Sequence, residues 1–250
     1  MCADDFAMSA GISRTIVELA QSGKLNAISC MAASRRWPAD AALLKDLPGD
    51  VEIGLHLVLT DEAPCVDTPE LVEGDQLPSA GRLGGMAFLR RLPIGAIGSE
   101  VNAQFERFEE VMGRPPDFVD GHQHVHFLPG IRRVVIEATS RRAPRAWLRT
   151  CEDKLWRILR RPFRVKSLVN ALQAAGFARA ARRAGLRCND SFAGFYDFRS
   201  PFQLLLPRFF TARGQFHLVI CHPGDTELAD DPISVARLKE AEALRKWISF

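Results

Sequence analysis

Apolar runs of strand length alternate along the chain with segments in which apolar residues recur at helical spacing. The runs predict five buried strands, at residues 27–31, 51–59, 118–126, 146–149 and 216–221. The helical spacing predicts six helices, at residues 13–22, 40–45, 99–112, 130–142, 166–184 and 234–249. Strands and helices that alternate in this way are typical of a parallel α/β protein.

Two stretches interrupt this alternation. Residues 61–98 are rich in glycine and proline and have weak periodicity, so we expect a long loop excursion over one face of the fold. Residues 151–166 are basic and amphipathic, which predicts a helical insertion. No internal repeat or linker divides the chain, and α/β barrels of this length are commonly single domains. We therefore expect one domain over residues 1–250.

The composition excludes a disordered chain, because 47% of the residues are hydrophobic and 25% are charged. The net charge of +3 conceals an uneven distribution, since the stretch from Arg132 to Arg187 holds sixteen Lys and Arg residues and three acidic residues. A basic stretch can bind nucleic acid, a membrane surface or an anionic ligand, but Arg-covered helix faces are the commoner explanation. We expect no nucleic-acid partner and leave a peripheral membrane contact open.

The sequence KLWRILRRPF, residues 154–163, bears on that contact. It places Leu155, Trp156, Ile158 and Leu159 among basic residues, which is compatible with a helix at a membrane interface. The same pattern fits an Arg-covered helix packed on the barrel, which is the interpretation we favour.

The cysteines indicate a reducing compartment. Six of them are scattered along the chain with no Cys-x-x-Cys pair and no secretory signal ahead of them, so we expect a cytoplasmic location. No apolar run reaches the roughly 18 residues of a membrane-spanning helix.

Half of the six histidines lie in one short stretch, DGHQHVH. In a strand, Asp120, His122, His124 and His126 would share one face, because side chains alternate with a period of two. Three imidazoles on a buried face would each need a polar partner, and neutral imidazole is the commonest metal ligand. The pattern therefore predicts a metal or catalytic site rather than an ordinary core strand.

Three other places carry candidate chemistry. The dipeptide Asp4-Asp5 is either an exposed turn or a pair of carboxylates with separate roles. His56 lies in the β-prone run EIGLHLVLT, where a strand covered on both faces rarely holds a histidine. His222 follows the apolar run LVIC, at the end of a predicted strand where barrels carry catalytic groups. One Asp and two His around a divalent ion would leave positions open for water and substrate.

The motifs ADDF, SAGI, GLHLVLT, DGHQHVHFLPG, CHPGD and PISVARLKEAEAL occur in this order over nearly the whole chain. In this order they resemble the YdjC-like family of carbohydrate deacetylases, the ChbG-type chito-oligosaccharide deacetylase group that also includes hopanoid-associated, HpnK-like members. The resemblance implies a (β/α) barrel of the glycoside hydrolase/deacetylase type with seven or eight mostly parallel strands. It also implies a divalent metal ion, Mg²⁺ or Zn²⁺, a homodimer, and hydrolysis of N-acetyl groups on a chito-oligosaccharide or a lipid-linked amino sugar.

Carried over position by position, the resemblance implies that Asp5, His56 and His122 are the metal ligands. Asp4 is then the general base, and His222 is the acid that protonates the departing amine. This division of roles is chemically coherent, because a metal ion polarises the amide carbonyl while the amide nitrogen leaves only once it is protonated.

The remaining motif residues are implied to support the site or to face the substrate. Asp120 would orient a histidine, as carboxylates behind metal ligands often do. His124 and His126 would lie behind the ligands or face the sugar, and Arg149 of WLRT matches a family arginine near the sugar.

The chain departs from the family pattern in two places. Only two residues precede ADDF, where the family has an apolar strand, and Ala7 replaces the usual glycine. We therefore expect the first strand to be truncated and the acid pair, Asp4 and Asp5, to lack a rigid mount.

Two other interpretations stay open. An amidohydrolase-type metal barrel that acts on a non-sugar amide would use the His-x-His of DGHQHVH, although such enzymes carry that motif on their first strand. A non-catalytic protein would instead use the basic residues 141–166 to bind a membrane surface or another anion.

Overall fold

Eight short strands form the centre of the molecule, and the computed structural model describes residues 1–228 and 230–247. The strand bounds are β1 Cys2–Phe6, β2 Ala27–Cys30, β3 Glu52–Leu57, β4 Phe118–Gly121, β5 Trp147–Leu148, β6 Arg187–Cys188, β7 Ser191–Ala193 and β8 His217–Cys221. All the pairings are parallel, in the order β6-β5-β4-β3-β2-β1-β8-β7, so the sheet curls into a half-barrel that ends at β6 and β7. This confirms the predicted α/β barrel of seven or eight parallel strands.

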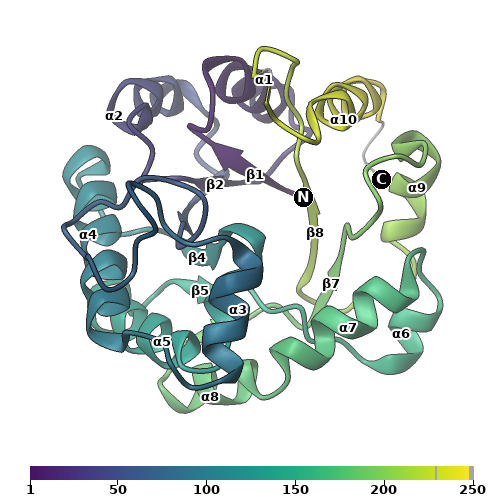
Figure 1. Ribbon diagram of the computed structural model, residues 1–250. Helices are drawn as coiled ribbons and strands as arrows, with labels where there is room; N and C mark the ends of the chain where they lie inside the picture. The colour runs from purple at the N-terminus through teal and green to yellow at the C-terminus, as the bar shows by residue number, and fades with distance from the viewer. Residues whose placement is uncertain (229, 248–250) are drawn as a thin grey trace.

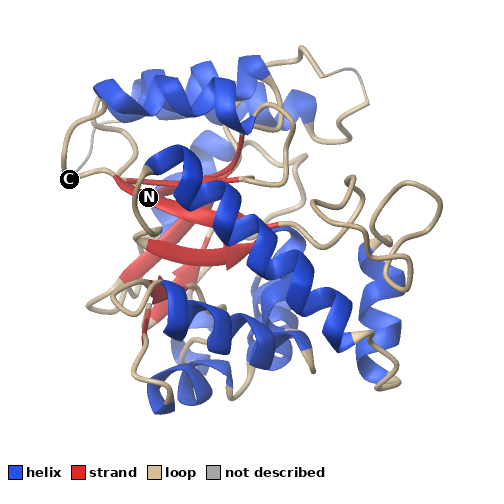
Figure 2. Ribbon diagram, turned by 90° about the vertical axis from the view of Figure 1, so that its left-hand side faces the viewer, coloured by secondary structure: helices blue, strands red, loops and turns tan. Residues whose placement is uncertain are grey.

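Helices surround the strands on the outside (Figures 1 and 2). Their bounds are α1 Ala10–Gln21, α2 Trp37–Asp40, η1 Ala41–Asp46, α3 Ala80–Phe88, α4 Ile94–Met112, η2 His122–Phe127, α5 Ile131–Arg142, α6 Leu155–Leu159, α7 Arg164–Ala174, α8 Phe177–Arg183, α9 Phe202–Phe209 and α10 Ser234–Lys246, where η marks a 3₁₀ helix. None of the described helices has the length and apolar character that a bilayer crossing requires.

The structure refines several predicted elements. The loop excursion at residues 61–98 contains α3 and the start of α4. The predicted helix at 166–184 is two helices, because Gly176 lies between them with a φ of +82° that a helix cannot contain. Strands β6 and β7 were not predicted, since two or three residues carry no readable periodicity. Helix α9 was not predicted either, and it contains a proline, Pro207, which is unusual within a helix. The last residues of the predicted helix at 234–249 lie outside the described part of the chain.

The expectation that the acid pair lacks a rigid mount is wrong. β1 is fully buried and pairs with β2 on one side and with β8 on the other, so it lies in the middle of the sheet. The turn that follows is also held firmly, because Ser13 accepts a hydrogen bond from the Ala7 N–H and Ser34 donates one to the Ala7 carbonyl. Ala7 has a φ of +74°, which explains why glycine suits this position, at a cost of about 1–2 kcal/mol for alanine.

The expectation that DGHQHVH forms a continuous strand is also wrong. β4 ends at Gly121, and the chain then turns through η2, where Gln123 and His124 have φ values of +52° and +60°. Left-handed residues break the period of two, so the side chains of the motif do not share one face. The three histidine side chains of the motif instead have different neighbours.

Candidate active site

The candidate residues meet at the carboxyl ends of the strands. Asp4, Asp5, His56, His122 and His222 all line one cleft of about 830 Å³. They come from β1, from β3 and from the segments that directly follow β4 and β8, because parallel strands open their carboxyl ends on the same side of the sheet. The structure therefore brings together side chains that are up to 218 positions apart, as Asp4 and His222 are.

Asp5, His56 and His122 form a cluster that could hold a cation. Each offers one ligand atom, and these atoms lie within 4.8 Å of one another. Asp5 Oδ1 lies 3.3 Å from His56 Nε2 and 2.9 Å from His122 Nδ1. Although burial by itself raises it, Arg237 and His122 hold the pKa of the Asp5 carboxyl well below its usual range, so the group is an anion at neutral pH.

Asp120 fixes the orientation of the His56 ring. Its Oδ1 accepts a hydrogen bond of 2.6 Å from His56 Nδ1, and Ser29 donates to the same oxygen at 2.6 Å. Burial opposes the charged ring, but Asp120 and Asp5 together raise the pKa of His56 to about 10. The ring therefore lies between two carboxylates, with Nδ1 bonded to Asp120 and Nε2 facing Asp5, and a divalent cation would take the place of the Nε2 proton.

Arg149 already occupies the space between a second group of potential ligands, which are Cys2, Asp4 and Asp120. The guanidinium bonds both oxygens of Asp4 at 2.6 Å, and one of its nitrogens lies 3.1 Å from Cys2 Sγ and 2.5 Å from Asp120 Oδ2. Burial alone would raise the pKa of Asp4, but Arg149 outweighs it and keeps that pKa well below its usual range. Arg149 is completely buried beneath the cleft and does not line it.

His222 lies across from Asp4, with its Nε2 3.9 Å from Asp4 Oδ2. Burial lowers the pKa of His222 to about 4, so the ring is neutral at pH 7. Its backbone N–H donates to Glu240 Oε2 at 2.5 Å, and the hydroxyl of Tyr196 donates to the other oxygen of Glu240 at 2.6 Å. These contacts tie the turn after β8 to α10.

Arg237 and Glu240 were not among the predicted site residues. Arg237 bonds the second oxygen of Asp5 at 2.8 Å and Asp231 at 2.5 Å, so it completes the surroundings of the acid pair. The sequence did hold a sign that both residues are buried. The spacing of one helix face is shared by Arg237, Glu240, Ala241 and Leu244. Charged residues on an otherwise apolar stripe are buried only when they have partners.

The other two histidines of DGHQHVH lie apart from the cluster. His126 is fully buried, and its Nε2 donates to the Arg149 carbonyl at 2.9 Å. His124 lines the cleft, where it packs against Phe192 and Phe195 with ring centroids 6.0 and 5.1 Å away. His126 thus supports the segment that carries Arg149, whereas His124 lies where a ligand could reach it.

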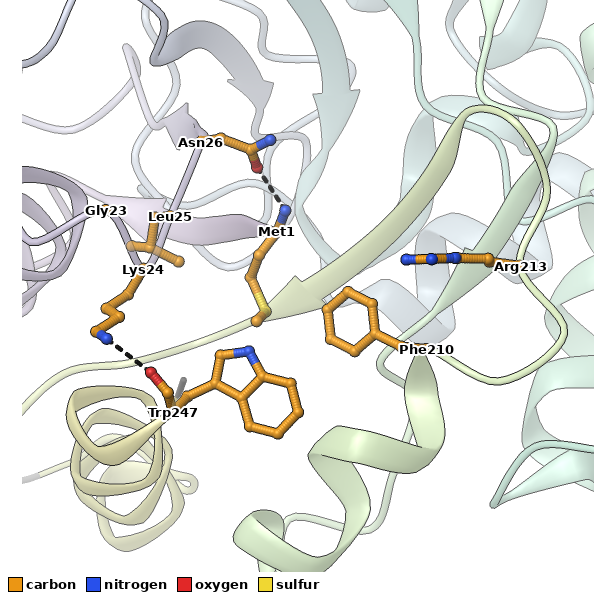
Figure 3. A pocket seen from close by; sticks show the side chains of 8 residues that line it. All are labelled: Met1, Gly23, Lys24, Leu25, Asn26, Phe210, Arg213 and Trp247. Carbon is orange, nitrogen blue, oxygen red and sulfur yellow. Dashed lines mark hydrogen bonds between the residues drawn. The ribbon is translucent and has the colours of Figure 1, made fainter. Parts of the chain in front are cut away.

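A smaller hollow of about 210 Å³ lies at the opposite, amino-terminal edge of the strands. Figure 3 shows its lining, in which the amine of Met1 bonds Asn26 and Lys24 bonds the carbonyl of Trp247. None of the predicted site residues lines this hollow. The larger cleft is therefore the candidate active site.

Comparisons with known proteins agree on the family and the fold. The sequence profile described as YdjC-like protein matches residues 1–246. A chitooligosaccharide deacetylase of Enterobacter sp. (strain 638) is 35% identical over 140 residues, which are 56% of this chain and 54% of that protein. One of Proteus mirabilis (strain HI4320) is 36% identical over 141 residues, with the same 56% and 54% coverage. The matches therefore span about half the length of these curated relatives.

A solved structure shares the whole fold. The crystal structure of an Enterococcus faecalis V583 protein, described as a cellobiose-phosphate cleavage protein, superposes with a TM-score of 0.70 at 20% identity. The superposition covers 97% of this chain and 88% of that protein. At this level of identity the likeness concerns the fold alone.

Proposed function

The chain belongs to the YdjC-like family, and from this premise we propose that it is a metal-dependent carbohydrate deacetylase, which hydrolyses the N-acetyl group of an amino sugar. The observation that carries the proposal is the cluster of Asp5, His56 and His122, which faces the cleft beside Asp4 and His222. The relatives named chitooligosaccharide deacetylase support the same substrate class.

The donor set fits a divalent cation. One carboxylate and two imidazoles suit Zn²⁺, and Mg²⁺ would accept the same residues with waters to complete its shell. Asp5, His56 and His122 would hold the ion. A bound cation supplies Lewis acidity, which polarises the acetamide carbonyl and lowers the pKa of a water molecule.

Asp4 is the proposed general base. Arg149 keeps its carboxylate ionised, so at neutral pH Asp4 is in the deprotonated form that a base requires. Because both of its oxygens are bonded to the guanidinium, the carboxylate is fixed in position rather than free to rotate. Arg149 and Asp120 do not line the cleft. Arg149 acts on the site by positioning Asp4, and Asp120 acts by orienting His56.

His222 is the proposed proton donor to the leaving amine. With a pKa of about 4 the resting ring is neutral, so it can receive the proton that Asp4 removes from water and pass it to the nitrogen. His222 Nε2 lies 3.9 Å from Asp4 Oδ2, and long distances of this kind between catalytic groups often shorten to hydrogen-bond length once a substrate is bound.

The walls of the cleft suit a sugar. Phe195 and Phe198 offer aromatic faces, while Gln123, Asn170 and His124 offer polar groups of the kind that hydroxyls bind. We propose a chito-oligosaccharide or a lipid-linked N-acetylated sugar as the substrate. This mixed lining favours a sugar over the non-sugar amide that an amidohydrolase would take.

The test is acetate release by the purified chain after chelation and after each divalent metal is added back. The substrates are N-acetylglucosamine, N,N′-diacetylchitobiose and a lipid-linked N-acetylglucosamine, with acetamide as a non-sugar control. We expect acetate from a sugar only when metal is present. Release from acetamide alone would favour the amidohydrolase, and a chain that binds no metal and releases no acetate from any of them would refute the proposal.

A further inference from the structure

Helix α7 carries its large apolar side chains on the wrong side for a helix that packs on a barrel. Val165, Leu168, Val169 and Leu172 recur at i, i+3, i+4 and i+7, which is the spacing of one helix face. Such a stripe normally faces the core. Here Val165 is 72% exposed and Leu172 is 66% exposed, and Ala174 is the only fully buried residue of the helix.

The barrel-facing side of α7 is built from small residues instead. Ser167, Ala171 and Ala174 lie at i, i+4 and i+7 on the side opposite the stripe, and each is partly or fully buried. Lys166 and Asn170 line the active-site cleft from a third side of the same helix. The apolar stripe is therefore an outward surface beside the mouth of the cleft.

Helix α6 extends this surface. It contacts α7, and Figure 1 shows the two helices next to each other in the outer ring. Leu155, Trp156 and Leu159 are 56%, 48% and 53% exposed, whereas Ile158 alone is buried. The interpretation that this helix packs its apolar residues on the barrel is correct for Ile158 and wrong for the other three.

Two arginines explain how α6 holds its place without those apolar contacts. Arg161 is buried and donates to the carbonyls of Phe192, Thr211 and Ala212, and Arg157 donates to the carbonyl of Asp190. These two residues are structural. Lys154, Arg160 and Arg164 are exposed and carry positive charge to the solvent.

The chain segment that carries this surface has charge of a single sign. From Lys154 to Cys188 the chain holds ten Lys and Arg residues and no Asp or Glu. Exposed apolar side chains interleaved with cations are the pattern by which interfacial helices bind anionic lipids, with tryptophan at the boundary.

We propose that the outer face of α6 and α7 seats the protein on an anionic lipid bilayer. This docking face comprises six apolar residues and three cations, Leu155, Trp156, Leu159, Val165, Val169, Leu172, Lys154, Arg160 and Arg164. Because α7 also lines the cleft, docking holds the mouth of the active site close to the lipid surface. A symmetric contact between two copies fits less well, since it would bring the cations of one copy against those of the other.

The experiment measures co-sedimentation of the full chain with vesicles of phosphatidylcholine, with and without phosphatidylglycerol. The apolar variant carries Trp156→Ser, Leu159→Ser and Leu172→Ser, and the charge variant carries Arg160→Gln and Arg164→Gln. The matched control carries Leu204→Ser and Val235→Ser, two residues of α9 and α10 that are 66% and 59% exposed. All of these side chains are exposed, so thermal unfolding should be unchanged in each variant.

We expect the wild-type chain to bind the anionic vesicles more tightly than the neutral ones. The apolar variant should bind at least tenfold more weakly, and the charge variant should lose roughly fivefold per cation and much of its salt dependence. The control should bind like the wild type.

Three results would overturn the proposal. These are no binding of the wild-type chain to anionic vesicles, equal losses in the control and the apolar variant, or a dimer in solution that the apolar variant dissociates while vesicle binding is absent. The last result would assign the face to the homodimer expected from the family. Since none of these measurements uses turnover, the docking face and the deacetylase proposal can fail independently.

Discussion

Replacing Arg149 with methionine tests whether the buried guanidinium holds Asp4 and Asp120 in place. Arg149 is fully buried, and it bonds both oxygens of Asp4 at 2.6 Å and contacts Asp120 at 2.5 Å. Removing one member of a buried ion pair leaves uncompensated charge and costs about 3–5 kcal/mol. At about 2–4 °C per kcal/mol for a chain of this size, the melting temperature should fall by roughly 10 °C.

The matched control is Arg245→Met. Arg245 bonds Glu18 with the same two-pronged geometry, at 2.7 and 2.8 Å, but the two side chains are 42% and 53% exposed. Solvent screens such a pair, so the free energy of unfolding should change by less than about 1 kcal/mol. The two variants therefore separate the effect of burial from the effect of the bond itself.

The pH dependence supplies a second measurement on the same variant. In the wild type Arg149 outweighs burial and lowers the pKa of Asp4, so this carboxylate stabilises the fold above the ordinary Asp pKa of about 4, and the contribution is lost as the pH falls below it. In Arg149→Met the strongest opposing interaction is gone, so burial raises the pKa of Asp4 above its wild-type value. Protonation of Asp4 then removes the unpaired buried charge from the variant. The difference in melting temperature between the wild type and Arg149→Met, followed by circular dichroism, should therefore narrow from neutral pH to about pH 4. Equal losses in Arg149→Met and Arg245→Met, or a gap that does not change with pH, would refute the reasoning.

Three further predictions follow from single contacts. Asp4→Asn should keep the metal content of the purified chain and lose turnover by about 10²–10⁴-fold, whereas His122→Ala should lose both, and loss of metal in Asp4→Asn would reverse the assigned roles. Burial lowers the pKa of His126 from 6.5 to about 4, so this group stabilises the fold above pH 6.5 and the contribution disappears as the pH falls toward 4. In urea titrations at a series of pH values, the free energy of unfolding of His126→Gln should therefore depend less steeply on pH in that window, by up to about 1.4 kcal/mol per pH unit. The same pH dependence as in the wild type would contradict the assignment. Gly54→Ala should destabilise the protein by about 1–3 kcal/mol because a Cβ there would collide with a buried aromatic ring, while Gly49→Ala, which meets nothing within 4 Å, should have little effect in the same urea titration.

The sequence alone predicted the residue types of the site better than it predicted their arrangement in space. His56 stood out because it lies within an apolar strand, and His222 because it follows one. Parallel strands open their carboxyl ends on one side, so the α/β pattern favoured their meeting in one cleft. DGHQHVH was recognised as unusual for a sound reason, since imidazoles need partners. Its conformation was not predictable, because two left-handed residues within η2 leave no trace in an alternating pattern.

The contacts that position the acid pair were beyond the sequence for a different reason. Arg237 reaches Asp5 across 232 positions of the chain, and Arg149 reaches Asp4 across 145. A pattern of residues records which side chains are buried or charged, but not which distant partner neutralises them. The first strand shows the same limit, because β1 takes its rigidity from β2 and β8 rather than from its own length.

What the sequence determined by itself was the class of fold, the family motifs and the residue types of the site, because these depend on local periodicity and on the chemistry of individual side chains. The tertiary structure decided which atoms meet, how Arg149 and Arg237 hold Asp4 and Asp5, and which side of α7 faces the solvent. The amphipathic stripe of that helix was readable in the sequence, but its direction was not. The direction depends on the small residues that pack against the barrel, and packing is a property of the whole fold.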